Sequence, residues 1–165
     1  MGKNFFRKIL VAVNGSQSSI HAAMYAVMMA RTYNTALKSV YVVDSATIKY
    51  LAMNRFLVND EKEDFEQKLR EDGKHYLSYV EMLASSKGVK MEKELRSGGV
   101  FTEIIKAADE YSADLILLGG NEREPGRSDV KRNVLSSAQS EVLANSKCPV
   151  LIIQKPKIEE LFKIF

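Results

Sequence analysis

The most apolar short run of the chain is residues 113–119, Ala-Asp-Leu-Ile-Leu-Leu-Gly, in which four aliphatic side chains follow one another. A strand that is covered on both faces has a nearly continuous apolar sequence, whereas a half-exposed strand alternates apolar and polar residues. This run therefore predicts a central strand of a sheet that is covered on both sides.

Further strand candidates lie on both sides of this run in the sequence. Residues 8–13 and 37–43 are rich in branched aliphatic side chains, and residues 149–153 form a last short apolar run. Residues 89–95 alternate apolar and charged side chains, which is typical of a half-exposed strand near a sheet edge. The chain thus has five strand candidates.

Helical patterns separate these strands. Apolar side chains recur at helical spacing over residues 18–31, 60–87 and 101–108, and a further helix is predicted over 134–145. Crossovers between parallel strands are right-handed, and both faces of the sheet must be covered. The alternation therefore predicts an α/β fold, a doubly wound five-stranded parallel sheet of order 3-2-1-4-5 with helices on both faces.

Two segments fall outside this alternation. Residues 46–58 are apolar without clean periodicity, and we interpret them as a connection, partly helical, that forms a lid over a site. Residues 155–165 carry apolar side chains at i, i+3, i+4 and i+7, which predicts an amphipathic C-terminal helix. Because no repeat or linker is evident, we expect one domain over 1–165, with its core in 7–154.

Composition excludes several classes of protein. The 24 Lys and Arg residues against 21 Asp and Glu give a charge of +3, too small and too dispersed for a nucleic-acid-binding face. The single cysteine, Cys148, excludes an intrachain disulfide, and two isolated histidines argue against a zinc site. No secretory signal and no membrane-spanning apolar run is evident, so we expect a cytoplasmic protein.

The predicted strand order also predicts where a ligand would bind. In an open α/β sheet the binding crevice lies beyond the carboxyl ends of the strands where the winding reverses, here between the first and fourth strands. Glycines and the start of the helix near residue 134 would present backbone N–H groups to an anion such as phosphate. The bordering residues are Asn14, Gly15 and Ser16 on one side and Gly119 and Gly120 on the other.

The chain resembles the universal stress protein family in the order and spacing of four segments. These segments are residues 9–16, 40–44, 114–119 and 148–153. The resemblance covers roughly residues 7–154. It implies a cytoplasmic protein that forms a homodimer through its last strand, residues 149–153. It also implies one of two groups, which either bind ATP or bind no nucleotide.

The ATP-binding group carries Gly-x-x-Gly, nine residues, and then Gly-Ser or Gly-Thr after the fourth strand. By this resemblance Gly126 matches the second glycine and Ser137 the phosphate-binding hydroxyl, while Ser136 stands at the third glycine. Arg123 stands at the first glycine, and Arg127 is a cation that could pair with phosphate or simply be solvated. The loop therefore keeps part of the pattern.

Two more site predictions come from the resemblance. Nucleotide-binding members carry Asp at the end of the first strand, where this chain has Asn14, an uncharged group that still donates and accepts hydrogen bonds. The backbone of Tyr41, Val42 and Val43 is expected to contact the edge of the adenine ring.

Two hypotheses of function follow. The first is a homodimeric stress-response protein that binds ATP or another adenine nucleotide, with or without Mg²⁺, and hydrolyses it at most slowly and incidentally. The alternative is a nucleotide-free, dimeric protein-interaction module without a cofactor. An enzyme is disfavoured because the crevice residues Asn14, Ser16, Ser136 and Ser137 include no evident base.

Overall fold

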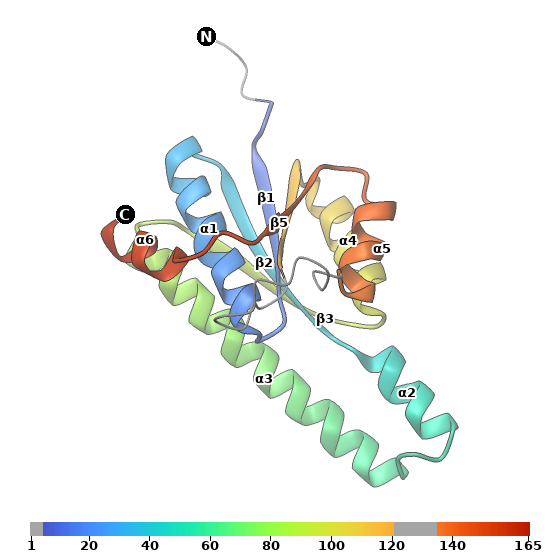
Figure 1. Cartoon of the computed structure of the whole chain (residues 1–165). Helices are drawn as coiled ribbons and strands as arrows, with labels where there is room; N and C mark the ends of the chain where they lie inside the picture. The colour runs from blue at the N-terminus through green and yellow to red at the C-terminus, as the bar shows by residue number, and fades with distance from the viewer. Residues whose placement is uncertain (1–4, 121–134) are drawn as a thin grey trace.

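The computed structural model describes residues 5–120 and 135–165 (Figure 1). Its sheet consists of five parallel strands in the order β3-β2-β1-β4-β5. The strands are β1 (Lys8–Val13), β2 (Ala36–Val43), β3 (Met91–Ser97), β4 (Leu115–Gly119) and β5 (Val150–Ile153). The doubly wound α/β fold and the strand order predicted from the sequence are confirmed.

Helices cover both faces of this sheet. α1 (Gln17–Tyr33) and α3 (Asn59–Ser86) lie on one face, and α4 (Val100–Tyr111) and α5 (Ser137–Asn145) lie on the other (Figure 1). Two further helices, α2 (Ser45–Met53) and α6 (Ile158–Ile164), lie outside the layer that touches the sheet. None of the described helices has the length and hydropathy needed to cross a bilayer.

The pleat of the central strands divides the core into two clusters. In β1, Ile9 and Val11 pack against α1, whereas Leu10 between them faces α4, and all three are fully buried. In β4, Leu117 packs in the cluster of α1, and Ile116 packs in the cluster of α4. Burial on both faces explains why these strands read as continuous apolar runs.

α1 is apolar on nearly its whole circumference because it is covered from two directions. Its inner side packs on β1 and β4, and its outer side meets α6, whose Ile158 and Phe162 are buried in the same cluster. The C-terminal ends of α1 and α6 are also in contact, since the Arg31 guanidinium lies over the Phe165 ring. The C-terminal helix predicted over 155–165 is thus present and serves as a third layer over α1.

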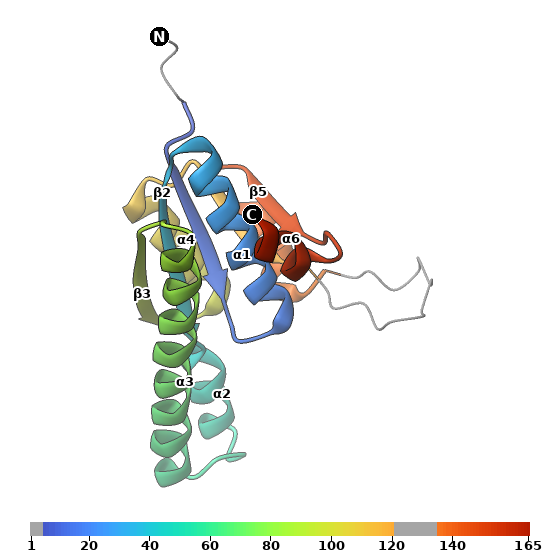
Figure 2. The ribbon, with the colours of Figure 1, turned by 90° about the vertical axis from the view of Figure 1, so that its left-hand side faces the viewer.

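α2 and the first half of α3 project beyond the sheet as an antiparallel pair of helices (Figure 2). Among the residues of α3 whose burial is described, 60–86, the buried ones begin at Gly73 and continue with Leu77, Val80 and Ala84. We call residues 45–72 the arm. The segment predicted as a partly helical lid, residues 46–58, is helical to Met53 and then forms a connection, and it runs away from the sheet beside α3.

Candidate functional site

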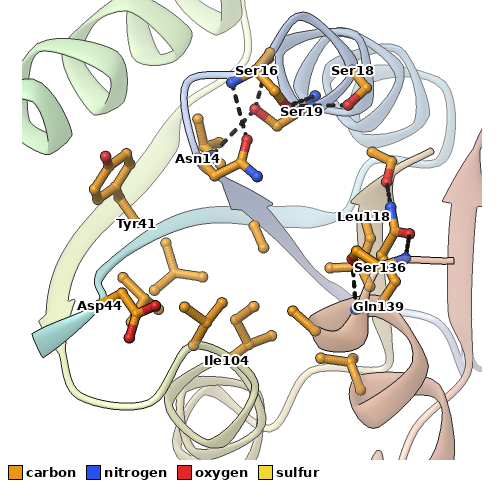
Figure 3. A pocket seen from close by; sticks show the side chains of 18 of the residues that line it. Asn14, Ser16, Ser18, Ser19, Tyr41, Asp44, Ile104, Leu118, Ser136 and Gln139 are labelled. Atoms are coloured by element: carbon orange, nitrogen blue, oxygen red, sulfur yellow. Dashed lines mark hydrogen bonds between the residues drawn. The ribbon is translucent and has the colours of Figure 1, made fainter. Parts of the chain in front are cut away.

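A pocket of about 620 Å³ opens at the carboxyl ends of β1, β2 and β4, where the winding of the sheet reverses (Figure 3). Its size is that of an ordinary small-molecule site. The first turns of α1 and α5 border it on two sides, and α3 and α4 supply further lining residues. Its position is the one that the strand order predicts.

The first polar edge of the pocket is the turn between β1 and α1. Asn14 Oδ1 accepts a hydrogen bond from the Ser16 backbone N–H at 3.0 Å, and the Asn14 N–H donates to Ser19 Oγ at 3.2 Å. Ser16 Oγ caps α1 by accepting from the Ser19 N–H at 3.2 Å, and it lies 3.1 Å from Ser18 Oγ. Three serine hydroxyls are thus held at the amino end of α1, facing the pocket.

Gly15 allows this turn to form. Its φ of +84° lies in the left-handed region, and a Cβ at this position would lie 2.6 Å from the Tyr76 ring. Tyr76 in turn stacks on Tyr41 with the ring centroids 6.4 Å apart and an interplanar angle of 10°. The turn after β1 therefore rests on a pair of aromatic rings.

The second polar edge is the amino end of α5. Ser136 Oγ accepts from the Gln139 N–H at 3.2 Å, and Gln139 Oε1 accepts from the Ser136 N–H at 2.8 Å, which forms a capping box. The Gln139 side chain also donates to the Gly119 carbonyl. One glutamine thereby fixes the start of α5 to the end of β4, on one side of the pocket (Figure 3).

The floor of the pocket is apolar. Its side chains come from the strands and from α4 and α5, and they continue the core cluster on that face of the sheet. A flat, weakly polar group such as an aromatic base fits a surface of this kind. The apolar floor residues are Ala12, Val40, Val42, Val100, Ile104, Leu118 and Val142.

Tyr41 forms part of another wall of the pocket. Burial raises the pKa of its phenol, with further contributions from the Asp72 carboxylate and from Tyr76, so the hydroxyl is neutral at physiological pH. Gly73 makes room for the ring, because a Cβ there would lie 2.6 Å from it. Tyr41 is thus a neutral, tightly packed wall residue and not a nucleophile.

Asp44 is the sole charged side chain among the described residues that line the pocket. It is the N-cap of α2, where Oδ1 accepts from the Thr47 N–H at 3.1 Å and Oδ2 accepts from the Thr47 hydroxyl at 2.7 Å. These two bonds fix the carboxylate at the side of the pocket opposite Ser136 and Gln139 (Figure 3). An ionised carboxylate retains further lone pairs, so Asp44 can accept another hydrogen bond from a ligand.

The described lining of the pocket contains no histidine, cysteine, lysine or arginine. Within the described residues, no three His, Cys, Asp or Glu side chains come together as a metal site. His21 lies 3.2 Å from Glu159 of α6 and is not a lining residue, and the ring of His75 packs edge-on against Tyr76. The arrangement is suited to binding a ligand.

The structure brings together part of the set of residues predicted from the sequence. Seven predicted residues line the pocket, namely Asn14, Ser16, Tyr41, Val42, Gly119, Gly120 and Ser136. Gly15, Val43 and Ser137 do not line it: Gly15 shapes the turn, Val43 is buried against α3, and Ser137 is exposed on α5. Arg123, Gly126 and Arg127 lie outside the described residues.

Sequence reasoning missed Asp44 and Gln139. Asp44 directly follows the apolar run 40–43, so an acidic residue at the carboxyl end of a central strand was an available signal. Gln139 was also detectable, because Ser136 and Gln139 have the Ser-x-x-Gln spacing of a capping box.

The fold and the pocket place the chain in the class of doubly wound α/β proteins with a pocket at the reversal of the sheet. The model of the universal stress protein family matches residues 5–154, and the chain belongs to this family. A similar relative is the universal stress protein MJ0531 of Methanocaldococcus jannaschii, which is 32% identical over 158 residues, covering 96% of this chain and 88% of the relative.

Solved structures show the same fold. A universal stress protein family member from Burkholderia pseudomallei aligns with a TM-score of 0.71 and 24% identity, over 93% of this chain and 100% of that one. A family member from Arabidopsis thaliana, solved with AMP bound, has a TM-score of 0.64 and 18% identity over 93% of this chain and 94% of that one. A further universal stress protein, solved in complex with cAMP, has a TM-score of 0.62 and 22% identity over 92% and 99%.

Proposed function

We propose that this stress protein binds an adenine nucleotide, ATP or AMP, in the pocket and acts as a cytoplasmic homodimer without a catalytic role. The observation that carries the proposal is the polarity of the pocket. One side holds a single carboxylate, Asp44, the floor is apolar, and the other sides are lined by hydroxyl groups at the amino ends of two helices.

The adenine ring fits between the apolar floor and Asp44. A carboxylate is acceptor-only, so it favours the exocyclic amino group at C6 of adenine. Held in the same orientation, guanine and hypoxanthine would place the carbonyl oxygen at C6 against the carboxylate, so that two acceptors would face each other. Two acceptors facing each other at the partly buried Asp44 should cost about 1–3 kcal/mol, which corresponds to about 5- to 150-fold in affinity. Asp44 is therefore the residue that selects the base.

The phosphate end fits the amino ends of α1 and α5. Helix amino ends carry unpaired N–H groups and a partial positive charge, and Ser16, Ser18 and Ser136 add hydroxyl donors. No cation is present among the described lining residues, so these residues would bind phosphate through neutral hydrogen-bond donors. The solved relatives with AMP and cAMP support a nucleotide of this kind.

One observation favours the alternative, a nucleotide-free interaction module. Gln139 already occupies the Ser136 N–H and the Gly119 carbonyl, so part of the hydrogen-bonding capacity at the α5 edge is used within the protein. If a phosphate cannot displace this amide, the pocket binds no nucleotide. The protein would then act through its surfaces.

The homodimer is proposed to form through β5. This strand pairs with β4 on one side and lies at the end of the strand order, and Leu151 in its middle is 39% exposed. Unpaired backbone at an apolar edge can pair with the same strand of a second copy about a twofold axis. Sedimentation of the full chain at micromolar concentration tests this, and a monomer would contradict it.

The nucleotide proposal is tested by mass spectrometry of the purified protein for retained nucleotide and by titration calorimetry with ATP, AMP and IMP. AMP should bind at least about fivefold more tightly than IMP, and Asp44→Asn should remove this preference. Asparagine is also a good N-cap, so α2 should stay folded in the variant. Asp109→Asn, on α4 and away from the pocket lining, is the matched control and should bind like the wild type.

The outcomes separate the two parts of the proposal. Absence of heat with millimolar ATP and AMP would refute nucleotide binding altogether. Equal affinities for AMP and IMP in the wild-type protein would refute base selection by Asp44 while leaving the nucleotide site in place.

A further inference from the structure

The far end of the arm exposes large apolar side chains. Between 46% and 74% of the surface of each of five residues is open to solvent, although they lie within a stretch of sixteen residues. Soluble proteins scatter single apolar residues on their surfaces, but a concentration of large ones marks an interaction site. The five residues are Tyr50, Met53, Phe56, Val58 and Phe65.

These side chains lie close together along the arm. Tyr50 and Met53 are in the last turn of α2, Phe56 and Val58 are in the connection, and Phe65 is in the second turn of α3. At 1.5 Å per helical residue, each lies within about 10 Å of the end of the arm. Both figures of the ribbon show this end standing away from the sheet (Figures 1 and 2).

The fold does not need the five side chains. α2 is held by Ile48, which is 2% exposed, and the buried residues of α3 all lie beyond the arm. Folding stability would therefore permit polar residues at these five positions. Their apolar character points to a binding partner.

Negative charge accompanies the apolar tip. Residues 50–66, which hold the five apolar side chains, contain five acidic residues against Arg55 and Lys62, a net charge of −3 in a chain whose total is +3. Acidic residues in a first helical turn stabilise the helix, which accounts for Asp60 and Glu61. Glu63, Asp64 and Glu66 lie beyond that turn, and none of them forms an ion pair with another described residue.

We infer that the tip of the arm is a docking surface for a cationic amphipathic helix of a partner protein. Apolar side chains on one face of such a helix would cover Met53, Phe56 and their neighbours, and lysine or arginine on its flanks would pair with the acids of residues 59–66. Two arms of this chain paired about a twofold axis would instead bring like charges together, which disfavours a second copy as the occupant.

The test uses the full-length protein and a fluorescent synthetic peptide of about 18 residues, with leucine at helical spacing and lysine elsewhere. Fluorescence anisotropy should show binding that weakens as salt rises from about 0.05 to 0.5 M. A peptide with glutamate in place of lysine, and one of the same composition with the leucine spacing scrambled, should each bind at least about tenfold more weakly.

Matched variants locate the binding surface. The double variant Met53→Ser, Phe56→Ser should weaken binding of the lysine peptide at least about tenfold. The double variant Tyr79→Ser, Met82→Ser, which changes exposed residues of α3 outside the arm, should bind like the wild type. Circular dichroism would show that both variants keep the helical content of the wild type.

Three results would overturn the inference. The first is no binding of the lysine peptide by the wild-type protein, and the second is equal binding by the arm variant. The third is a fall in oligomeric state of the arm variant in sedimentation, which would make a second copy the occupant of the tip.

Discussion

Gly119 lies directly against the backbone of Ser18, so that a Cβ on the glycine would be 2.5 Å from the Ser18 carbonyl carbon. The first turn of α1 therefore packs on the end of β4 without an intervening side chain. Because the contact is backbone against backbone, a rotamer change cannot relieve it. We predict that Gly119→Ala lowers the free energy of unfolding by about 3 kcal/mol, measured by urea denaturation.

A second glycine serves as the control. Gly99 has an extended φ of −74°, and a Cβ there would meet nothing closer than 3.6 Å. Gly99→Ala should change the free energy of unfolding by less than about 1 kcal/mol. Equal stabilities of the two variants would show that α1 can move away from β4.

The C-terminal helix contributes to stability through one aromatic ring. Phe162 is 6% exposed and packs in the cluster of α1, and the Lys87 ammonium lies over its ring. Replacing a buried phenylalanine with alanine removes apolar burial and leaves a cavity. Phe162→Ala should therefore lower the free energy of unfolding by about 3 kcal/mol.

Ile164 on the same helix is 84% exposed and offers a matched control. Ile164→Ala should change the free energy of unfolding by less than about 0.5 kcal/mol. Thermal denaturation of Phe162→Ala and Ile164→Ala compares the two effects. Similar midpoints would mean that α6 is not packed on α1 in solution.

Acid should weaken the protein through Glu94 on β3. Burial raises the pKa of this carboxyl, but hydrogen bonds and charge from Lys38 and Arg96 outweigh burial, so the pKa is lowered from its usual 4.5. A lowered pKa in the folded state means that the unfolded chain binds the proton more readily. The contribution of Glu94 is thus complete above the unfolded pKa and is lost as the pH falls through the folded pKa.

Glu94→Gln should accordingly make stability less dependent on pH over the acid range. Urea denaturation between about pH 3 and pH 7 measures this slope. Glu92→Gln on the same strand changes an exposed carboxylate that makes no ion pair with a described residue, so it should leave the slope near that of the wild type. An unchanged slope in Glu94→Gln would contradict the ion-pair assignment.

The strands could be predicted because burial on both faces of a strand requires apolar residues at consecutive positions of the sequence. Residues 8–13 and 113–119 are apolar at consecutive positions, as they must be when neighbouring side chains face α1 and α4 in turn. α2 could not be predicted from periodicity. It is nine residues long and buries Ile48 alone, so its apolar residues follow no helical stripe.

The candidate site was predicted as a location more fully than as a set of contacts. The predicted strand order placed the site at the turn of residues 14–16 and at the end of β4, and both border the pocket. Asp44 and Gln139 act through hydrogen bonds to Thr47 and to the Gly119 carbonyl. The Asp44 bonds are a local helix cap, whereas the Gln139 bond joins α5 to β4 and depends on the packing of separate elements, which hydrophobic spacing does not encode.

α3 is a single helix with two different supports. From Gly73 onward its buried side chains pack on the sheet. Before that residue it packs beside α2, and its links to the sheet are the partly buried Leu69 and a hydrogen bond from Arg70 to Ser97 Oγ. Opening of the arm therefore breaks few apolar contacts, whereas opening of the remainder requires the sheet to lose its cover. The molecule can consequently unravel and reform its outermost turns as a separate cooperative unit while the rest stays native.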